Sequence, residues 1–223
     1  MITVIFAVST MACASFASLL TQSITLPATG TITYTSSRTI IVQVSASHDD
    51  AGAWWDWAGV YWTWTLDKSH VSVGHFEFGD RYYNGGLRFR NVNIPQGAKI
   101  VSAVLKFCAD QSCAGTRARW NTYGQNSGNC NEFSTIDDFL ARPKTVAVVD
   151  TGFWGMWTEG EWYTSPDIAT IIQEIVNRSD WNSGNALAIL LYGHPEAGTT
   201  HEIRSYDADP SQAAVLEVTY KIG

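Results

Sequence analysis

Residues 86–109 read GLRFRNVNIPQGAKIVSAVLKFCA and contain the clearest strand pattern of the chain. In the first part, Leu87 and Phe89 alternate with arginines, which is typical of a strand with one face against a core. The tract at 93–97, NIPQG, predicts a turn because it combines Asn, Pro and Gly. Residues 99–109 then form a long, mostly apolar run. This stretch therefore indicates a β-rich domain.

Short strand-like segments continue on both sides of this stretch. They are rich in Val, Ile, Thr and Tyr, and Gly, Pro and Asn separate them. The expected strands are residues 23–26, 31–35, 39–46, 71–78, 117–123, 145–149, 186–192, 203–206 and 214–220. Many short strands with frequent turn signals are typical of a β-sandwich.

One amphipathic helix is expected at about residues 166–178. Ser165 suits an N-cap, and Pro166 suits the first helical position. Apolar residues then recur at spacings of three and four, at Ile168, Ile171, Ile172, Ile175 and Val176. This spacing gives the helix one apolar face, which would pack on the sandwich.

The composition limits the classes of function. The chain has 223 residues, which suits one domain with a sizeable core. Its formal net charge of −7 makes nucleic acid and anionic lipid surfaces poor partners. Ten Trp, nine Tyr and nine Phe exceed the needs of one core, so some rings are expected at the surface.

Residues 1–20 carry no charged side chain. One interpretation is a secretory signal peptide, cleaved near Ala14 or Ala17. The segment lacks the usual Lys or Arg, and the other interpretation is a retained hydrophobic helix, weakly similar to a pilin N-terminus. Both interpretations place the rest of the chain outside the cytoplasm. We therefore expect the hydrophobic segment, a strand-prone extension at 21–46, and a sandwich at 47–223.

Four cysteines are present, Cys13, Cys108, Cys113 and Cys130. Their spacing matches no common metal motif, and in an exported protein a disulfide is the default. The preferred pair is Cys113 with Cys130. Cys108 would then be free, or it would pair with Cys113 instead, and the sequence does not choose between these connectivities.

Three blocks together resemble a known extracellular domain. They are LRFRNVNIPQGAKIVSAVLKFCAD at 87–110, SPDIATIIQEIVNRSDWNSGNALAILL at 165–191, and IRSYDADPSQAAVLEVTY at 203–220. This pattern is similar to the DNRLRE-type jelly-roll modules of bacterial and archaeal secreted proteins and to their relatives among carbohydrate-binding modules. The segment VSASHDDAG at 44–52 resembles the family's opening with two acids.

The resemblance covers about residues 44–220. It implies a jelly roll, often stabilised by calcium, with a role in adhesion or polysaccharide contact. Two features depart from the family pattern. Gln125 follows Gly124 where members often carry an acid, which puts a metal site there in doubt, and the aromatic tract at 54–64 is not a family feature.

No catalytic residues are predicted. Glycoside hydrolysis needs two facing carboxylates, and the sequence spacing does not pair the candidates Glu77, Asp80, Glu159, Glu161 and Glu174. No nucleophile motif such as G-x-S-x-G is present. His194, Glu196, His201 and Glu202 lie close in sequence and could contact a metal, but we interpret them as loop residues. The chain is therefore expected not to be an enzyme, with glycoside hydrolase as the remaining alternative.

Acidic residues in expected loops are candidate ligands for a structural calcium ion, which prefers oxygen donors. The candidates are Asp49, Asp50, Asp110, Asp207 and Asp209. The competing interpretation is that these are solvated acids in turns. Asn177 begins an Asn-x-Ser sequence and is a candidate glycosylation site.

The aromatic tract AWWDWAGVYWTWT at 53–65 is the most unusual segment. Alternation would place Trp62 and Trp64 on one face of a strand. Exposed rings can stack on sugars or on a partner subunit, whereas the alternative is that all of them are buried. The candidate binding residues are Trp54, Trp55, Trp57, Tyr61, Trp62 and Trp64.

Two functions remain open for this extracellular or cell-surface chain. The first is a non-catalytic structural and adhesive protein, which would self-associate through its N-terminal segment into a filament or pilus. The second is a secreted carbohydrate-binding module with the Trp-rich tract as its platform and calcium as a structural ion. The polysaccharide partner of the second hypothesis is also compatible with the first.

Overall fold

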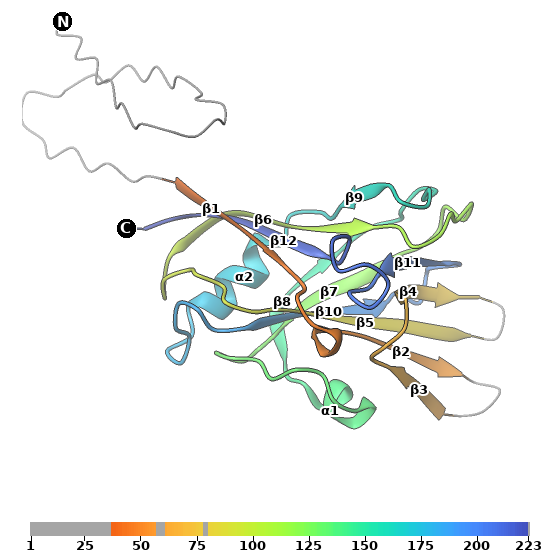
Figure 1. Cartoon of the computed structure of the whole chain (residues 1–223), viewed down its shortest axis with the longest axis horizontal. Helices are drawn as coiled ribbons and strands as arrows, with labels where there is room; N and C mark the ends of the chain where they lie inside the picture. Colours follow the sequence, from red (N-terminus) through yellow and green to blue (C-terminus); the bar gives the residue numbers. More distant parts are fainter. Residues whose placement is uncertain (1–36, 57–60, 78–79, 223) are drawn as a thin grey trace, which may run out of the picture. The chain divides into compact units, whose positions relative to one another are not determined.

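The computed structural model describes residues 37–56, 61–77 and 80–222, and these form two antiparallel sheets (Figure 1). The smaller sheet has the order β1-β12-β6-β9. Its strands are β1 (Ser37–Gln43), β12 (Val215–Lys221), β6 (Lys99–Cys108) and β9 (Trp162–Thr164). The larger sheet has the order β11-β4-β5-β10-β7-β8, and β2 joins it through β5 and carries β3.

The strands of the larger sheet come from the whole length of the described chain. They are β2 (Asp50–Asp56), β3 (Tyr61–Thr65), β4 (His70–Phe76), β5 (Arg81–Phe89), β7 (Trp120–Gln125), β8 (Lys144–Asp150), β10 (Leu187–Gly193) and β11 (Thr200–Arg204). The helical elements are η1 (Ser47–Asp49), α1 (Ile136–Ala141) and α2 (Ala169–Val176). The predicted mostly β sandwich is confirmed.

The main core lies between the two sheets. β6 contributes Leu105 and Phe107, which are fully buried, and β5 contributes Leu87 and Phe89. On β6 the buried positions alternate with more exposed ones such as Val101, which is 46% exposed. The alternation at Leu87 and Phe89 therefore predicted the face that β5 buries, whereas the apolar run at 99–109 predicted the strand β6 without its buried face.

Helix α2 closes one side of this core. Ile171 and Ile175 pack so closely on β7 that a Cβ atom added to Gly124 would lie 2.8 Å and 2.7 Å from their side chains. The helix begins at Ala169 and is shorter than predicted, because the side chains of residues 165 and 167 accept hydrogen bonds from the backbone of β6. Ser165 Oγ accepts a hydrogen bond from Leu105 N (2.9 Å), and Asp167 Oδ1 accepts one from Ala103 N (2.9 Å).

The structure also contains a helix that the sequence reading did not predict. In α1 the Thr135 hydroxyl accepts a hydrogen bond from Asp138 N (3.1 Å), which is an ordinary N-cap. Phe139 is buried, whereas Leu140 is partly exposed. A six-residue helix offers too short a stretch for its apolar period to stand out in the sequence.

The expected disulfide is wrong, because Cys108, Cys113 and Cys130 are all free thiols. Cys113 pairs its backbone with Trp157, and Cys130 donates its N–H to Ala186 O. Strand β7 lies between them in sequence, and its six residues span about 20 Å. A disulfide requires Cα atoms within about 7 Å of each other, so position along the chain was a poor guide here.

Several expectations concern residues 1–36 and lie outside the described residues. These are the hydrophobic segment at 1–20 and most of the extension at 21–46. Within the described ranges, no helix is long and apolar enough to cross a bilayer. The end of the extension, β1, pairs with the chain's own β12.

The buried face of β6 allows a test of the core on a single strand. Leu105→Ala should reduce the free energy of unfolding by about 2–5 kcal/mol, because it removes a fully buried side chain and leaves a cavity. Val101→Ala is the matched control on the same strand and should cost less than about 1 kcal/mol. Urea denaturation of the two variants checks this, and equal losses would contradict the described packing of β6.

Candidate functional site

The larger sheet has a second apolar face, opposite the core. Two neighbouring glycines of β5 distinguish the two faces. A Cβ atom added to Gly85 would contact Val71 and Val73 of the main core. A Cβ atom added to Gly86 would contact the ring of Phe133 on the opposite face. Residues of this outer face are in register across β3, β2, β5 and β10. The pairs are Trp55 with Trp62, Ala53 with Asn84, and Asn84 with Tyr192.

The segment between β7 and β8, which carries α1, covers one part of this outer face. Phe133 and Phe139 are fully buried there. Arg142 holds the segment in place: it donates to Gln125 Oε1 (2.8 Å) and to Glu132 O (2.6 Å), and its guanidinium lies 4.2 Å from the Phe133 ring. The covered part of the face is therefore a second, smaller core.

The rest of the outer face forms an open pocket with a volume of about 390 Å³. Its lining residues are Trp55, Trp62, Tyr82, Asn84, Tyr192 and Gly193. Four of the six are aromatic and none is charged. Any side chain at position 193 is excluded, because its Cβ would lie 1.9 Å from Gly74 O. The glycine therefore leaves room in this part of the pocket.

The aromatic rings of the pocket are fixed by their neighbours. Trp55 and Trp62 form a cross-strand pair, with ring centroids 5.5 Å apart and planes tilted by 56°. Tyr82 stacks on His75 at 4.4 Å. His75 is itself held at both ring nitrogens, by Ala197 O (3.0 Å) and by Asp80 Oδ1 (2.7 Å).

Two polar groups complete the pocket. Asn84 is buried, and its Oδ1 accepts a hydrogen bond from Gly193 N (3.0 Å). Its Nδ2 has no acceptor among the residues that the structure describes. Burial raises the pKa of Tyr192 to about 12, so this phenol is neutral, and the Lys144 ammonium lies 3.4 Å from its ring centroid. The pocket thus offers flat apolar walls and an amide donor.

Four of the six predicted aromatic binding residues have described side chains, and these four divide between the two faces. Trp55 and Trp62 line the pocket. Trp54 instead stacks on Tyr83 at 6.4 Å and lies under the Lys68 ammonium at 4.6 Å. Trp64 shares the face of Trp62 but packs against Phe139 of α1 at 5.5 Å. Trp57 and the side chain of Tyr61 lie outside the described part.

Among the described residues, no three of the five candidate calcium ligands form a metal-ligand group. Asp49 is buried between Arg88 (2.5 Å) and Arg90 (2.8 Å). Asp50 Oδ2 accepts a hydrogen bond from Tyr206 N (2.7 Å). Asp207 accepts from Ser47 and lies near Asp50, whose pKa it helps to raise, whereas Asp209 accepts from Ser211 and Asp110 pairs with Arg204 and faces His70. All five thus have hydrogen-bonding or ion-pairing partners of their own, and they do not form one oxygen-rich site.

The sequence cluster near the C-terminus is also dispersed. His201 is fully buried and stacks on Trp157 at 4.3 Å, and burial lowers its pKa to about 4. Its Nε2 donates to Gly155 O (3.0 Å). Glu196 pairs with Arg119, whereas Glu202 points to His70 on β4. Asn177 is exposed at the end of α2.

A scan against protein-family models finds no match, and a search of curated proteins finds none either. The resemblance to jelly-roll modules of the DNRLRE type therefore stays a prediction.

Asp50 makes the free energy of unfolding depend on pH. Burial raises its pKa to about 7 from an ordinary value of 3.8. The folded protein therefore holds a proton between about pH 4 and pH 7 that the unfolded chain releases, and the stability from this proton is lost as the pH rises through that window. In Asp50→Asn this fall, on the order of 2–4 kcal/mol, should be absent, since the amide oxygen can still accept from Tyr206 N.

Denaturation in urea at several pH values within that window checks this expectation. Asp67→Asn, at an exposed position in the turn between β3 and β4, is the control and should keep the slope of the wild type. If Asp50→Asn keeps the same slope as well, another group is responsible for it.

Proposed function

We propose that this chain is a non-catalytic extracellular module that binds a neutral carbohydrate chain in the aromatic pocket. The observation that carries the proposal is the open pocket on the outer face, with Trp55, Trp62, Tyr82 and Tyr192 as walls and Asn84 between them. Its volume lies within the range of about 300–1,000 Å³ that is usual for small-molecule sites.

The chemistry of the pocket favours a sugar over other ligands. A sugar ring has apolar C–H faces, which pack on aromatic rings, and hydroxyl groups at its rim, which accept hydrogen bonds from an amide. The Nδ2 group of Asn84 is such a donor. No charged residue lines the pocket and the net charge of the chain is −7, so a neutral glycan is favoured over an acidic one.

The openness of the site fits a polymer. The pocket lies on an open sheet face, so a glycan chain could enter and leave at its ends. The rings are held by pairing between strands and by His75, and a rigid site loses little conformational entropy on binding. We propose a non-catalytic module because the sequence contains no nucleophile motif and no carboxylate pair at a recognisable spacing.

A self-assembling filament subunit is the second candidate. Its support is strand β1, which among the described strands is an edge strand that pairs with β12 alone. Ile41 on this strand is 68% exposed. An edge of this kind can accept a strand from another copy of the chain. β1 itself occupies its own sheet, so the donated strand would have to come from another segment.

Glycan binding is tested with a panel of neutral polysaccharides and isothermal titration calorimetry. Trp55→Ala and Trp62→Ala should each weaken binding about tenfold or more, because each removes one stacking wall. Trp162→Ala is the matched control, since Trp162 is 44% exposed on β9 of the other sheet. Its affinity should equal that of the wild type.

Failure would take one of two forms. The wild type would bind no polysaccharide of the panel, or all three tryptophan variants would lose affinity equally. Quenching of tryptophan fluorescence by the bound glycan gives a second readout, and Trp62→Ala should reduce this quenching.

Filament formation is tested by electron microscopy of the purified full chain. If β1 accepts a strand, Ile41→Lys should reduce the length or number of filaments, because a charge on an edge strand opposes pairing. Val146→Lys is the control on the other sheet, where Val146 is 90% exposed on β8. Monodisperse monomers of the wild type would rule the second candidate out.

A further inference from the structure

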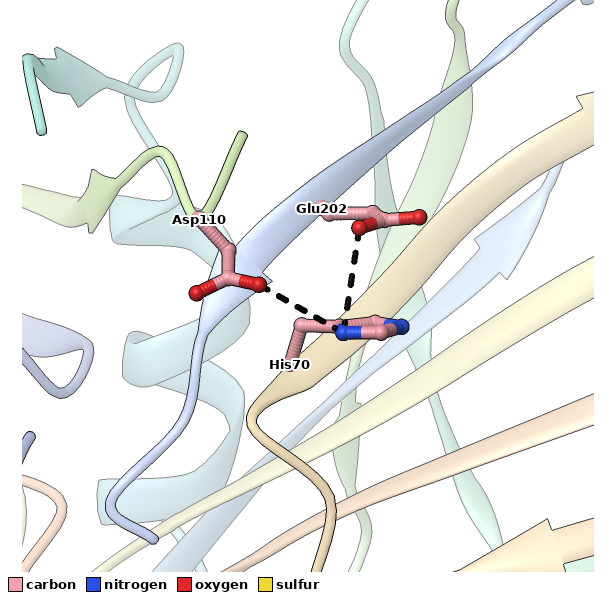
Figure 2. Close-up of side chains that lie close together, drawn as sticks. All are labelled: His70, Asp110 and Glu202. Carbon is pink, nitrogen blue, oxygen red and sulfur yellow. Dashed lines mark ion pairs between the residues drawn. The ribbon is translucent and has the colours of Figure 1, made fainter. Parts of the chain in front are cut away.

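A cluster of one histidine and two carboxylates lies at an edge of the larger sheet and shares no residue with the aromatic pocket. His70 begins β4, Glu202 lies on β11, and Asp110 follows β6. Figure 2 shows both carboxylates turned toward the same ring nitrogen of His70. The three ligand atoms all lie within 4.8 Å of one another.

Backbone pairing fixes the three segments that carry this cluster. β4 and β11 are antiparallel neighbours, with Arg204 opposite His70. Directly after β6, Ala109 forms an isolated β-bridge with Ile203 of β11. The next residue, Asp110, donates its backbone N–H to Glu202 O (2.9 Å). The side chains thus come from rigid elements, which is the usual basis of a preorganised site.

The distances suit a bridging cation better than direct hydrogen bonds. His70 Nδ1 is 3.5 Å from Asp110 Oδ2 and 3.7 Å from Glu202 Oε2. Both separations exceed the usual N–H···O distance of about 2.7–3.2 Å. In a tetrahedral zinc site with bonds of about 2.0–2.1 Å, neighbouring ligand atoms are about 3.3–3.4 Å apart. Small rotations of the side chains would bring the three atoms to that geometry.

Groups around the cluster orient its ligands. Arg204 Nε donates to Asp110 Oδ1 (3.0 Å), so the other oxygen of this carboxylate is left to face His70. Arg204 is held in turn by Gln212 Oε1 (2.5 Å). Ligating carboxylates in proteins are commonly hydrogen-bonded in this way. The Ser69 hydroxyl lies 3.2 Å from His70 Nδ1 and can hydrogen-bond to the lone pair that a cation would take.

Charge and burial also favour a cation. The side chains of His70, Asp110 and Glu202 are 27%, 17% and 20% exposed, so they are partly desolvated but open to ions. A divalent cation between the two carboxylates would offset both their desolvation and their repulsion.

We propose that His70 Nδ1, Asp110 Oδ2 and Glu202 Oε2 bind one divalent transition-metal cation, with Zn²⁺ as the best match. One imidazole and two carboxylates are donors that suit zinc, whereas calcium prefers six to eight oxygens. Such an ion would join β4 and β11 to the end of β6, where the two sheets meet. The remaining coordination positions belong to water or to an external ligand.

The test uses tag-free full-length protein, stripped with a chelator and titrated with ZnCl₂ in a calorimeter. The wild type should bind one Zn²⁺ per chain, and Glu202→Gln and His70→Gln should each bind at least tenfold more weakly. His194→Gln is the matched control, because His194 is also a half-buried histidine beside a glutamate. This control should bind zinc as the wild type does.

Substitution with Co²⁺ gives a readout that a purely structural role of these residues would not change. The wild type should show the visible d–d absorption of a four-coordinate site, and His70→Gln should lose it while its circular dichroism stays unchanged. Zinc binding that is unaltered in both variants, binding that His194→Gln also removes, or binding of Ca²⁺ but not Zn²⁺ would overturn the proposal.

Discussion

The structure depends on the register of β5, which has neighbours along both edges and side chains buried on both faces. β10 and β4 pair with successive parts of β5, and β2 pairs along the opposite edge, so that Tyr83 is opposite both Gly74 and Trp54. Leu87 and Phe89 enter the main core, while Asn84 and Gly86 face outward. A slip by one residue would exchange these two sets, placing leucine under Phe133 and glycine in the core. The core, the covered outer face and the aromatic pocket are therefore fixed together.

Local periodicity was enough to predict much of this fold. The alternation at Leu87 and Phe89 and the apolar run of β6 gave two central strands, and the isoleucine spacing gave α2. The start of α2 was missed because Ser165 and Asp167 accept hydrogen bonds from β6, a contact between segments about 60 residues apart. The predicted disulfide was wrong for the same reason. The distance in space between Cys113 and Cys130 depends on how the chain runs through β7, and their spacing in sequence does not give that distance.

The candidate sites show the same limit. Trp55 and Trp62 could be proposed from the sequence because the aromatic tract is unusual in itself. Tyr82, Asn84 and Tyr192 could not, because they join the pocket only through the pairing of β2 with β5 and of β5 with β10. His70 had no sequence signal at all, and Asp110 and Glu202 were assigned to different groups. Backbone pairing among three distant segments creates that cluster.

Glu174 on α2 occupies two backbone N–H groups of the edge strand β8. Its two carboxylate oxygens accept hydrogen bonds from Val146 N (2.9 Å) and Ala147 N (2.8 Å) of the edge strand β8. A strand that approached β8 would have to displace a charged acceptor that is already satisfied. The edge of β8 is therefore protected by helix α2, whereas β1 pairs with β12 alone among the strands that the structure describes. Addition of a further strand at this point of β8 would cost the two hydrogen bonds to Glu174, so this border of the larger sheet is disfavoured for pairing with another copy.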